Sequence, residues 1–350
     1  MKFGLFGGAR ARGGPAGDSY AYHDFVNYVI EAEKLGFASV FLVEHHFTGF
    51  GQVSASMSLL AYLAARTERI RLGTAVVVLP WHNPILVAEQ AATLDLLSNG
   101  RLDFGVGKGY RTYEFSGFCI PPEEATERFD EAMAVIRKAW TSQGRFSHHG
   151  KRWQFDNVIV EPSPIQQPHP PFWLGAGSAE SIRRAAREGC NLLLDQIAPT
   201  DLIIERVATF RHECERVGRQ YDPMMVGVTR GLQIVHNEEE RKRAIVTRRQ
   251  VLKNIGDLAR GPGAERYAHI KEDEDSFVAR RRALARHAGG DHRAVEAPRS
   301  GWCRKCAVRR ARRFGRGSPH LCRGNHARLR PRADGPRPGV VKPHTETARR

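Results

Sequence analysis

The sequence predicts an α/β protein built as a (β/α)8 TIM-type barrel, whose last βα unit is missing or replaced by a basic tail. Short β-rich runs alternate with longer stretches of helical periodicity, which is the pattern of repeated βα units around a parallel sheet. A chain of 350 residues is long enough to bury one large core. We therefore expect one barrel-sized domain with an extra segment.

Seven βα units can be followed along the chain. Strands are expected at Phe3–Phe6, Ser39–Val43, Ile70–Leu79, Leu102–Val106, Phe172–Leu174, Leu192–Leu194 and Met225–Val235. The helices expected between them are Tyr22–Leu35, Ser54–Ala65, Pro84–Ser98, Glu123–Trp140, Ala179–Glu188, Asp201–Val217 and Glu238–Asn254. The polar and Pro-rich stretch Gly144–Pro171 is expected to be a surface excursion. After about Gly256 no convincing eighth strand and helix follow.

The C-terminal fifth differs from the rest in composition. Residues 279–350 hold 21 Lys and Arg against 4 Asp and Glu, a net charge of +17, which leaves −1 of the chain's +16 for residues 1–278. Eight of these 72 residues are Leu, Ile, Val or Phe, a composition typical of disorder. We expect a barrel domain over 1–278 and an Arg-rich, low-order tail over 279–350.

Three origins of this tail are open. Its richness in Arg, Gly, Pro, Ala and His is what a GC-rich gene gives in the wrong reading frame, so the leading hypothesis is a frameshift near Val278. A genuine extension could instead bind nucleic acid through its charge, or zinc through Cys303, Cys306, Cys322 and His326. The third origin is a disordered tail of another purpose.

Composition and missing motifs weaken several function classes. Six cysteines in a chain of this length do not form a disulfide framework, and Cys119, Cys190 and Cys214 lie far apart in sequence, which fits a reducing compartment. No signal-peptide stretch or run approaching about 18 apolar residues occurs, so we expect a cytoplasmic protein that does not span a membrane. Without a Gly-x-Ser-x-Gly elbow, a Walker loop or a His-Glu-x-x-His motif, serine hydrolases, NTPases and zincins are disfavoured.

The second expected strand ends in Glu44, His45 and His46, and functional groups of parallel barrels gather at such strand ends. These side chains could be metal ligands, acid/base groups or polar rim residues. Neighbouring side chains on a strand point to opposite faces, so adjacent histidines chelate one metal less naturally than a His-x-His pair. A catalytic or cofactor-contacting histidine is favoured, and no metal site is expected.

Two further strand ends suit a flat cofactor with a phosphate. The run Leu72–Pro84 is either core or the wall on which a ring system lies. The segment Gly105–Arg111 combines three glycines with Lys108 and Arg111, which suits close approach of an anion. Arg128, in the next helix, is either another phosphate ligand or a solvated surface arginine.

A fourth segment, Phe172–Ser181, passes through glycines into a helix whose first amides can bind an anion. It also imitates a dinucleotide-binding fingerprint, but Glu180 stands where that motif requires its third glycine. A barrel phosphate site is therefore favoured over a Rossmann site.

Several of these motifs together resemble the bacterial luciferase-like flavin monooxygenases. They are Glu44–Thr48 with Gly51, Leu79 and Pro80 with His82 and Pro84, and Gly100–Gly105. The similarity covers roughly residues 1–254. It implies a barrel that uses reduced FMN from a separate flavin reductase and oxygenates a small organic substrate, such as an aldehyde, through a peroxyflavin. A homodimer or heterodimer is also implied.

The resemblance also assigns residues. It makes His45 the catalytic histidine, with His46 and Glu44 beside it. The cofactor-binding residues that it implies are Thr74, Ala75 and Val76 under the flavin ring, and Lys108, Arg128, Gly177, Ser178 and Ser181 at the phosphate. Gly107 replaces a reactive cysteine of luciferase, so thiol chemistry does not follow. Light emission does not follow either, because many relatives share these motifs and are dark.

Three alternatives stay open. Some relatives use a deazaflavin and transfer hydride on the same barrel. Nucleic-acid binding through the tail would be a function of another class, and a metal-dependent barrel hydrolase is a further one. The sequence does not identify the substrate.

Overall fold

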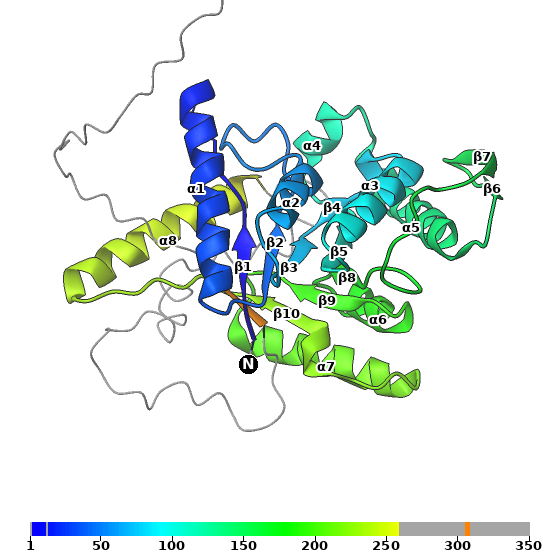
Figure 1. The fold of residues 1–350 in the computed structure, drawn as a ribbon. Coiled ribbons are helices and arrows are strands. Elements are labelled where there is room, and N and C mark those ends of the chain that lie inside the picture. Colours follow the sequence, from blue (N-terminus) through cyan, green and yellow to red (C-terminus); the bar gives the residue numbers. More distant parts are fainter. Residues whose placement is uncertain (1, 12, 259–304, 309–350) are drawn as a thin grey trace, which may run out of the picture. The chain divides into compact units, whose positions relative to one another are not determined.

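Parallel strands form the centre of the protein, and helices cover them (Figure 1). The computed structural model describes residues 2–11, 13–258 and 305–308, all within the unit Met1–Ala311. The strands of the main sheet are β1 (Lys2–Gly7), β2 (Ser39–Leu42), β3 (Arg71–Thr74), β4 (Val77–Val78), β5 (Leu102–Gly107), β8 (Phe172–Gly175), β9 (Asn191–Leu194), β10 (Val226–Thr229) and β11 (Lys305–Val308). Their order is β3-β2-β1-β11-β10-β9-β8-β5-β4, and a further pairing of β3 with β5 brings the two ends together as a barrel.

The eighth strand position is occupied by β11, in a segment where no strand was expected. β11 pairs in parallel with β1, where Ala307 is opposite Gly4, and with β10, where Ala307 is opposite Thr229. Edge strands have unpaired backbone groups, and a short extended segment satisfies them. The other residues of 279–350, including Cys303, Cys322 and His326, lie outside the described residues.

The helices follow the expected order. They are α1 (Pro15–Lys34), α2 (Ser56–Ala64), α3 (Pro84–Leu97), α5 (Ala125–Thr141), α6 (Ala179–Arg187), α7 (Thr200–Arg216) and α8 (Glu238–Leu258). α3 shows how local sequence sets an end: the Asn83 side chain accepts a hydrogen bond from the amide of Ile85 at 3.0 Å, and Pro84 takes the first turn. The helix stops before Asn99 and Gly100, which both have positive φ.

Two expected strands needed correction. The run Ile70–Leu79 divides into β3 and β4 at a cis peptide bond between Ala75 and Val76, and the 3-10 turn η1 (Leu79–Trp81) follows. The run Met225–Val235 is a strand only as far as Thr229, because η3 (Pro223–Met225) occupies its start and residues after Thr229 leave the sheet.

The structure contains further elements that were not predicted from the sequence. A short helix α4 (Thr112–Gly117) follows β5, and the turn η2 (Pro122–Glu124) precedes α5. Within the surface excursion, β6 (Phe146–His149) and β7 (Gln154–Val158) form an antiparallel hairpin. α4 has six residues, which is too short for helical periodicity to show.

The barrel interior is filled by aromatic side chains. Trp173 is 2% exposed, and its indole N–H donates a hydrogen bond of 3.0 Å to Asp103. Phe41 meets Trp173 edge to face at 5.4 Å between ring centroids. A Cβ on Gly73 would lie 2.3 Å from the Phe41 ring, so this position requires glycine. The interior is packed rather than hollow, and ligand binding is left to the ends of the barrel.

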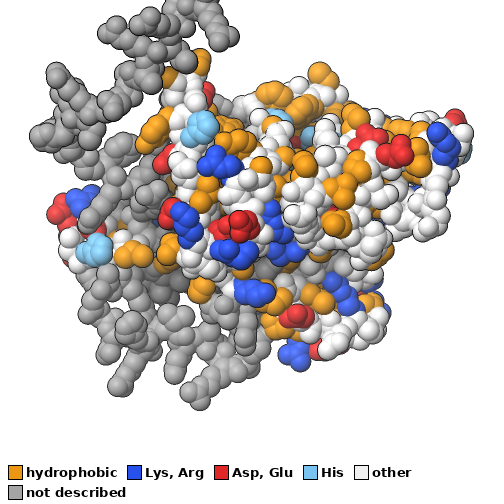
Figure 2. All heavy atoms as spheres, in the orientation of Figure 1, with side chains coloured by type: hydrophobic (Ala, Val, Ile, Leu, Met, Phe, Trp, Pro, Cys, Tyr) orange, Lys and Arg blue, Asp and Glu red, His pale blue; other side chains and the backbone are white. Residues whose placement is uncertain are grey.

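The described surface agrees with the near-neutral charge of residues 1–278. Basic and acidic side chains are mixed on the face drawn in Figure 2. No helix within residues 2–11 and 13–258 combines the length and apolarity that a bilayer crossing needs.

Candidate active site

Three expected site residues, Glu44, Lys108 and Gly177, come to the same end of the barrel as His82 and Asp195. Glu44 lies just after β2, His82 just after η1, and Lys108 directly after β5. Gly177 follows β8, and Asp195 follows β9. Because these strands are parallel, all five positions lie at their C-terminal ends.

A buried carboxylate joins two histidines at this end. Glu44 is 4% exposed, and its Oε1 lies 3.0 Å from Nε2 of His46 and 2.7 Å from Nε2 of His82. Burial opposes ionisation of Glu44, but the hydrogen bonds of His46 and His82 outweigh it and keep the pKa of this carboxyl below its ordinary value. Glu44 therefore holds a negative charge that fixes both rings.

His45 has different partners. Its Nδ1 lies 3.2 Å from Oε1 of Glu114, and the same oxygen accepts the backbone N–H of His46 at 2.9 Å. Arg111, which is 2% exposed, places Nη1 3.7 Å from this carboxylate. Glu114 is therefore the centre of a second buried charge cluster, and it holds His45 in one orientation.

The protonation state of His45 follows from this environment. Burial lowers the pKa of His45 below its ordinary value of 6.5, and the Arg111 charge adds to the lowering, although Glu114 opposes it. The imidazole is then neutral at pH 7. A neutral ring that donates from Nδ1 to a carboxylate has a lone pair at Nε2, which can accept a proton.

Aromatic side chains surround His46. The Phe118 ring lies 4.8 Å from His46 between centroids, and the Trp81 ring lies 5.5 Å from it. Trp81 and Phe118 stack at 5.2 Å, and Phe115 packs edge-on against Trp81. Because Glu44 is buried, its hydrogen bonds are stronger than they would be in water.

Within the segment Thr74–Val76, the side chain of Thr74 is buried in the sheet, whereas Ala75 and Val76 are half-buried. The Thr74 hydroxyl is buried and exchanges two hydrogen bonds with the backbone of Gly105, at 2.7 and 2.8 Å. Its side chain therefore joins β3 to β5. Ala75 and Val76 are half-buried between fully buried neighbours, and their place under a flat ring stays a prediction.

The phosphate-binding candidates lie on neighbouring elements. Ser178 and Ser181 form a capping box at the start of α6, in which each side chain bonds the backbone of the other. Lys108 donates to the hydroxyl of Thr126 at 3.0 Å. Arg128 is paired with Glu124 at 2.8 Å, so an anion would have to compete with that carboxylate.

Sequence reasoning missed Glu114, and it noted Arg111 and His82 without joining them to the histidines. Glu114 lies 69 positions after His45, on the helix α4 that was not expected. Its position three residues after Arg111 is a weak signal, because a carboxylate near an arginine is common on any surface.

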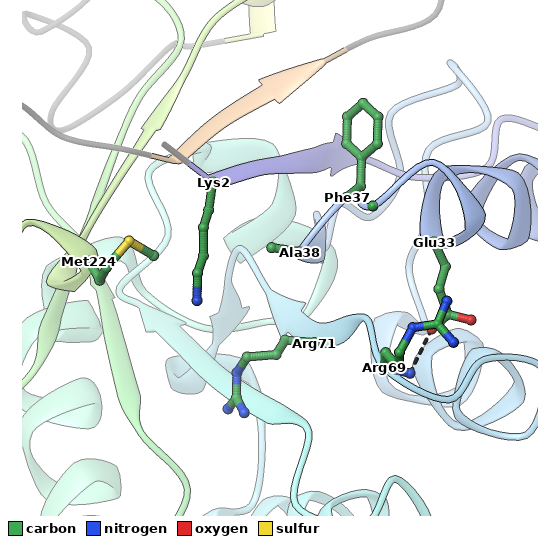
Figure 3. Close-up of a pocket in the computed structure, with 8 residues that line it drawn as sticks. Lys2, Glu33, Phe37, Ala38, Arg69, Arg71 and Met224 are labelled. Atoms are coloured by element: carbon green, nitrogen blue, oxygen red, sulfur yellow. Dashed lines mark hydrogen bonds between the residues drawn. The ribbon is translucent and has the colours of Figure 1, made fainter.

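A hollow of about 370 Å³ lies at the opposite end of the barrel (Figure 3). Its lining includes Lys2, Arg71 and Met224, which stand at or before the first residues of β1, β3 and β10. Arg71 is bound there to Asp103 through Nε and Nη2, both at 3.0 Å. Because this is the N-terminal end of the strands, the hollow is separate from the candidate active site.

The chain resembles proteins of known family. A sequence model of the luciferase-like monooxygenases matches residues 1–300. The oxygenase component of a flavin-dependent trigonelline monooxygenase from Acinetobacter baylyi is 31% identical over 219 residues, which is 62% of this chain and 60% of that protein. Alignments with this and two similar curated relatives span 55% to 61% of the relatives' lengths.

Solved structures share the fold. An F420-dependent secondary alcohol dehydrogenase, solved with an F420–acetone adduct, has a TM-score of 0.69 and 17% identity, and the match covers 88% of this chain and 92% of that one. The oxygenating constituent of 3,6-diketocamphane monooxygenase from Pseudomonas putida, solved with FMN, has a TM-score of 0.62 and 18% identity over 71% of both chains. At these identities the likeness concerns the fold alone.

Proposed function

The chain belongs to the luciferase-like monooxygenase family, and on that premise we propose that it is an FMN-dependent monooxygenase that oxygenates a small organic substrate at the C-terminal end of its barrel. The observation that carries the proposal is the pairing of His45 with buried Glu114. It supplies a neutral, oriented imidazole at the strand end where the chemistry of such barrels occurs.

The residues present fit a flavin mononucleotide. The half-buried apolar surface of Ala75 and Val76 suits one face of an isoalloxazine ring. The start of α6 offers helix amides and the hydroxyls of Ser178 and Ser181, and Lys108 adds a positive charge after the neighbouring strand β5. Bound reduced FMN would supply the electron pair that lets one oxygen atom of O2 enter the substrate while the other leaves as water.

The chain's own residues would control protons and water. His45 would accept a proton at Nε2 and return it, because Glu114 fixes Nδ1 as the donor. Glu44 would keep His46 and His82 in place. The aromatic side chains of Trp81 and Phe118 would exclude water, which otherwise competes at the reacting atoms.

We also propose a separate flavin reductase as the source of reduced FMN. The trigonelline relative is named as an oxygenase component, which supports a second protein in that system. A homodimer or heterodimer, implied by the resemblance, is part of the same proposal.

Anaerobic titration with reduced FMN, followed by rapid mixing with O2 and candidate aldehydes or heteroaromatic compounds, tests the function. We expect saturable binding and transfer of ¹⁸O from ¹⁸O2 into one substrate. Turnover with reduced F420 and without O2 consumption would instead establish hydride transfer, the activity of the deazaflavin alternative. Absence of binding to either cofactor would contradict both assignments.

A further inference from the structure

Arg206 lies in the second turn of α7, beside the turn that leads into α6. Its Nη2 is 3.4 Å from the position that a Cβ on Gly177 would occupy, and its Cζ is 3.8 Å from it. Its side chain is 9% exposed. A buried guanidinium therefore stands against Gly177, where the Gly177–Ser181 turn begins.

Asp195 holds this guanidinium in place. Its Oδ2 accepts a hydrogen bond of 2.8 Å from Nη1 of Arg206, and its Oδ1 accepts the amides of Ile197 and Ala198, both at 2.7 Å. Burial opposes ionisation of Asp195, but the amide of Ala198 and the charge of Arg206 outweigh it and keep the pKa of this carboxyl low. Arg206 is thus oriented by a charged, rigid partner.

The hydrogen-bonding capacity of Arg206 exceeds what the described residues supply. A guanidinium has five N–H donors and no acceptor, and the Nε of Arg206 is buried without a partner among the described residues. A buried donor without an acceptor costs free energy, so such a group calls for an additional acceptor. Nη2 is the nitrogen of Arg206 that lies nearest to Gly177, so an acceptor at the start of α6 would meet Nη2 first.

Other groups at this turn favour an anion. The capping box uses the amide of Ser181. The first amides of a helix have no acceptor within the helix, so those of Ala179 and Glu180 can donate to an anion at the start of α6. Arg128, expected as a phosphate ligand, is instead paired with Glu124, which also binds Arg152 at 3.0 Å. An anion at this turn would therefore meet Arg206 more directly than Arg128.

We propose that Arg206 is an additional ligand of the flavin phosphate monoester, which it binds together with the first amides of α6. This inference rests on the proposed FMN-dependent function and adds to it a residue outside the matched motifs. The phosphate would take the free donor edge of the guanidinium, and Asp195 would keep that edge turned toward Gly177.

The test compares FMN with riboflavin, which lacks only the phosphate. Reduced flavins are titrated anaerobically into wild type, Arg206→Met and Arg206→Lys, and dissociation constants are taken from the fluorescence change. We expect Arg206→Met to raise the Kd for FMN about 10- to 100-fold and to leave the Kd for riboflavin within about twofold. Arg206→Lys keeps a charge for Asp195 but loses the planar fork, so an intermediate effect is expected.

Two further variants keep the test decisive. Arg211→Met changes an exposed arginine of the same helix, paired with Glu215, and should leave both constants unchanged. Gly177→Ala would put a methyl group at ordinary contact distance from Arg206 and should weaken FMN alone, without needing a change at Arg206. An unchanged FMN constant in Arg206→Met, or an equal loss for both flavins, would overturn the assignment.

Failure of the proposed function gives a different result. If wild type binds neither flavin, the FMN-dependent function is wrong, and Arg206 is tested by inorganic phosphate instead. At constant ionic strength, phosphate should raise the Tm of wild type and Arg211→Met more than that of Arg206→Lys. Equal increases in the three proteins would overturn a phosphate site at Arg206.

Discussion

Glu44 and His82 are joined by a hydrogen bond of 2.7 Å between Oε1 and Nε2, although they follow different strands and lie 38 positions apart. The same oxygen binds His46, so one buried charge fixes two imidazoles. The side chain of His82 is 30% exposed, whereas that of Glu44 is 3% exposed. The pair thus joins the protein interior to its surface at the barrel mouth.

Replacing Glu44 by Gln should destabilise the protein. One oxygen of Glu44 binds both histidines, and the amide oxygen that replaces it has no charge, so both hydrogen bonds become weaker in a buried setting. We expect the free energy of unfolding to fall by about 1 to 3 kcal/mol, measured by urea denaturation at pH 7. Glu68→Gln, at a side chain that is 86% exposed, is the control and should change it by less than about 0.5 kcal/mol. Equal stability of the two variants would contradict the bridging role.

Replacing His45 by Gln should separate oxygen chemistry from flavin binding. The variant lacks the proton acceptor at Nε2 but leaves the phosphate-binding turn intact. We expect substrate oxygenation to fall about 100- to 10,000-fold, while the Kd for reduced FMN stays within about threefold. His149→Gln, on an exposed histidine of β6, is the matched control. Full oxygenation by the His45 variant would remove this residue from the mechanism.

The pKa of His45 predicts a pH dependence of stability. Because this pKa is lowered in the folded state, the unfolded chain binds more protons, and the free energy of unfolding rises with pH. The contribution is complete above the ordinary value of 6.5 and is lost as the pH falls through the lowered folded value. The lowered pKa of Glu44 acts only below its ordinary value of 4.5, so a decline of stability between pH 6.5 and pH 4.5 does not come from Glu44.

Urea unfolding between pH 8 and pH 4.5 measures this contribution. The range begins above the ordinary pKa of His, 6.5, and ends at that of Glu, 4.5. His45→Asn should flatten the decline of stability below about pH 6.5. The half-buried His169 also has a lowered pKa, caused mainly by burial, so His169→Asn should remove a separate part of the same decline. A curve for His45→Asn that stays parallel to wild type would refute the lowered pKa.

Much of the barrel was predictable because its signals are local. The strand Leu102–Val106 and the helix Pro84–Ser98 carry continuous apolar runs and readable caps, and the structure confirms both within one residue. β11 was not predictable, because the segment Lys305–Val308 is surrounded by basic residues and its pairing depends on what β1 and β10 leave unpaired. Strand pairing between distant segments has no local signature.

The site was predictable in part for a similar reason. Histidines and glycines at strand ends are visible in the sequence, and the structure brings His45 and His46 to the barrel mouth as expected. Their partners are less visible, because Glu114 and Arg206 are ordinary helix residues until the fold buries them. Burial, rather than residue type, makes these side chains candidates.

Lys108 offers a prediction about charge and geometry. Lysine binds a phosphate as a point charge, whereas arginine can bind two oxygens at once. We expect Lys108→Ala to raise the Kd for FMN about tenfold, and Lys108→Arg to match or improve on wild type. Riboflavin affinity should be equal in all three proteins. A loss of affinity for both flavins in Lys108→Ala would show that this residue supports the fold near Thr126 instead of binding phosphate.

The coding DNA provides a test of the tail. We propose that residues 279–350 arise from a shifted reading frame, because this stretch has a net charge of +17, against −1 for the rest of the chain, and few apolar residues. Translation of codons 260–350 in the other forward frames should then show an apolar strand followed by a capped amphipathic helix. The repaired chain should have a higher Tm than the present one, because a complete βα unit buries apolar surface that four residues of β11 do not.

The opposite outcome has its own consequence. If no frame encodes such a unit, β11 is the natural eighth strand, and its backbone N–H groups are needed between β1 and β10. Ala307→Pro would then remove a donor from a central strand and should unfold the barrel or lower its Tm strongly. If the frame is shifted, Ala307 belongs to a segment that the native barrel does not contain. The repaired chain then has a different residue and a different sequence at this position. The difference in Tm between Ala307→Pro and the present chain therefore measures how much this strand stabilises the barrel.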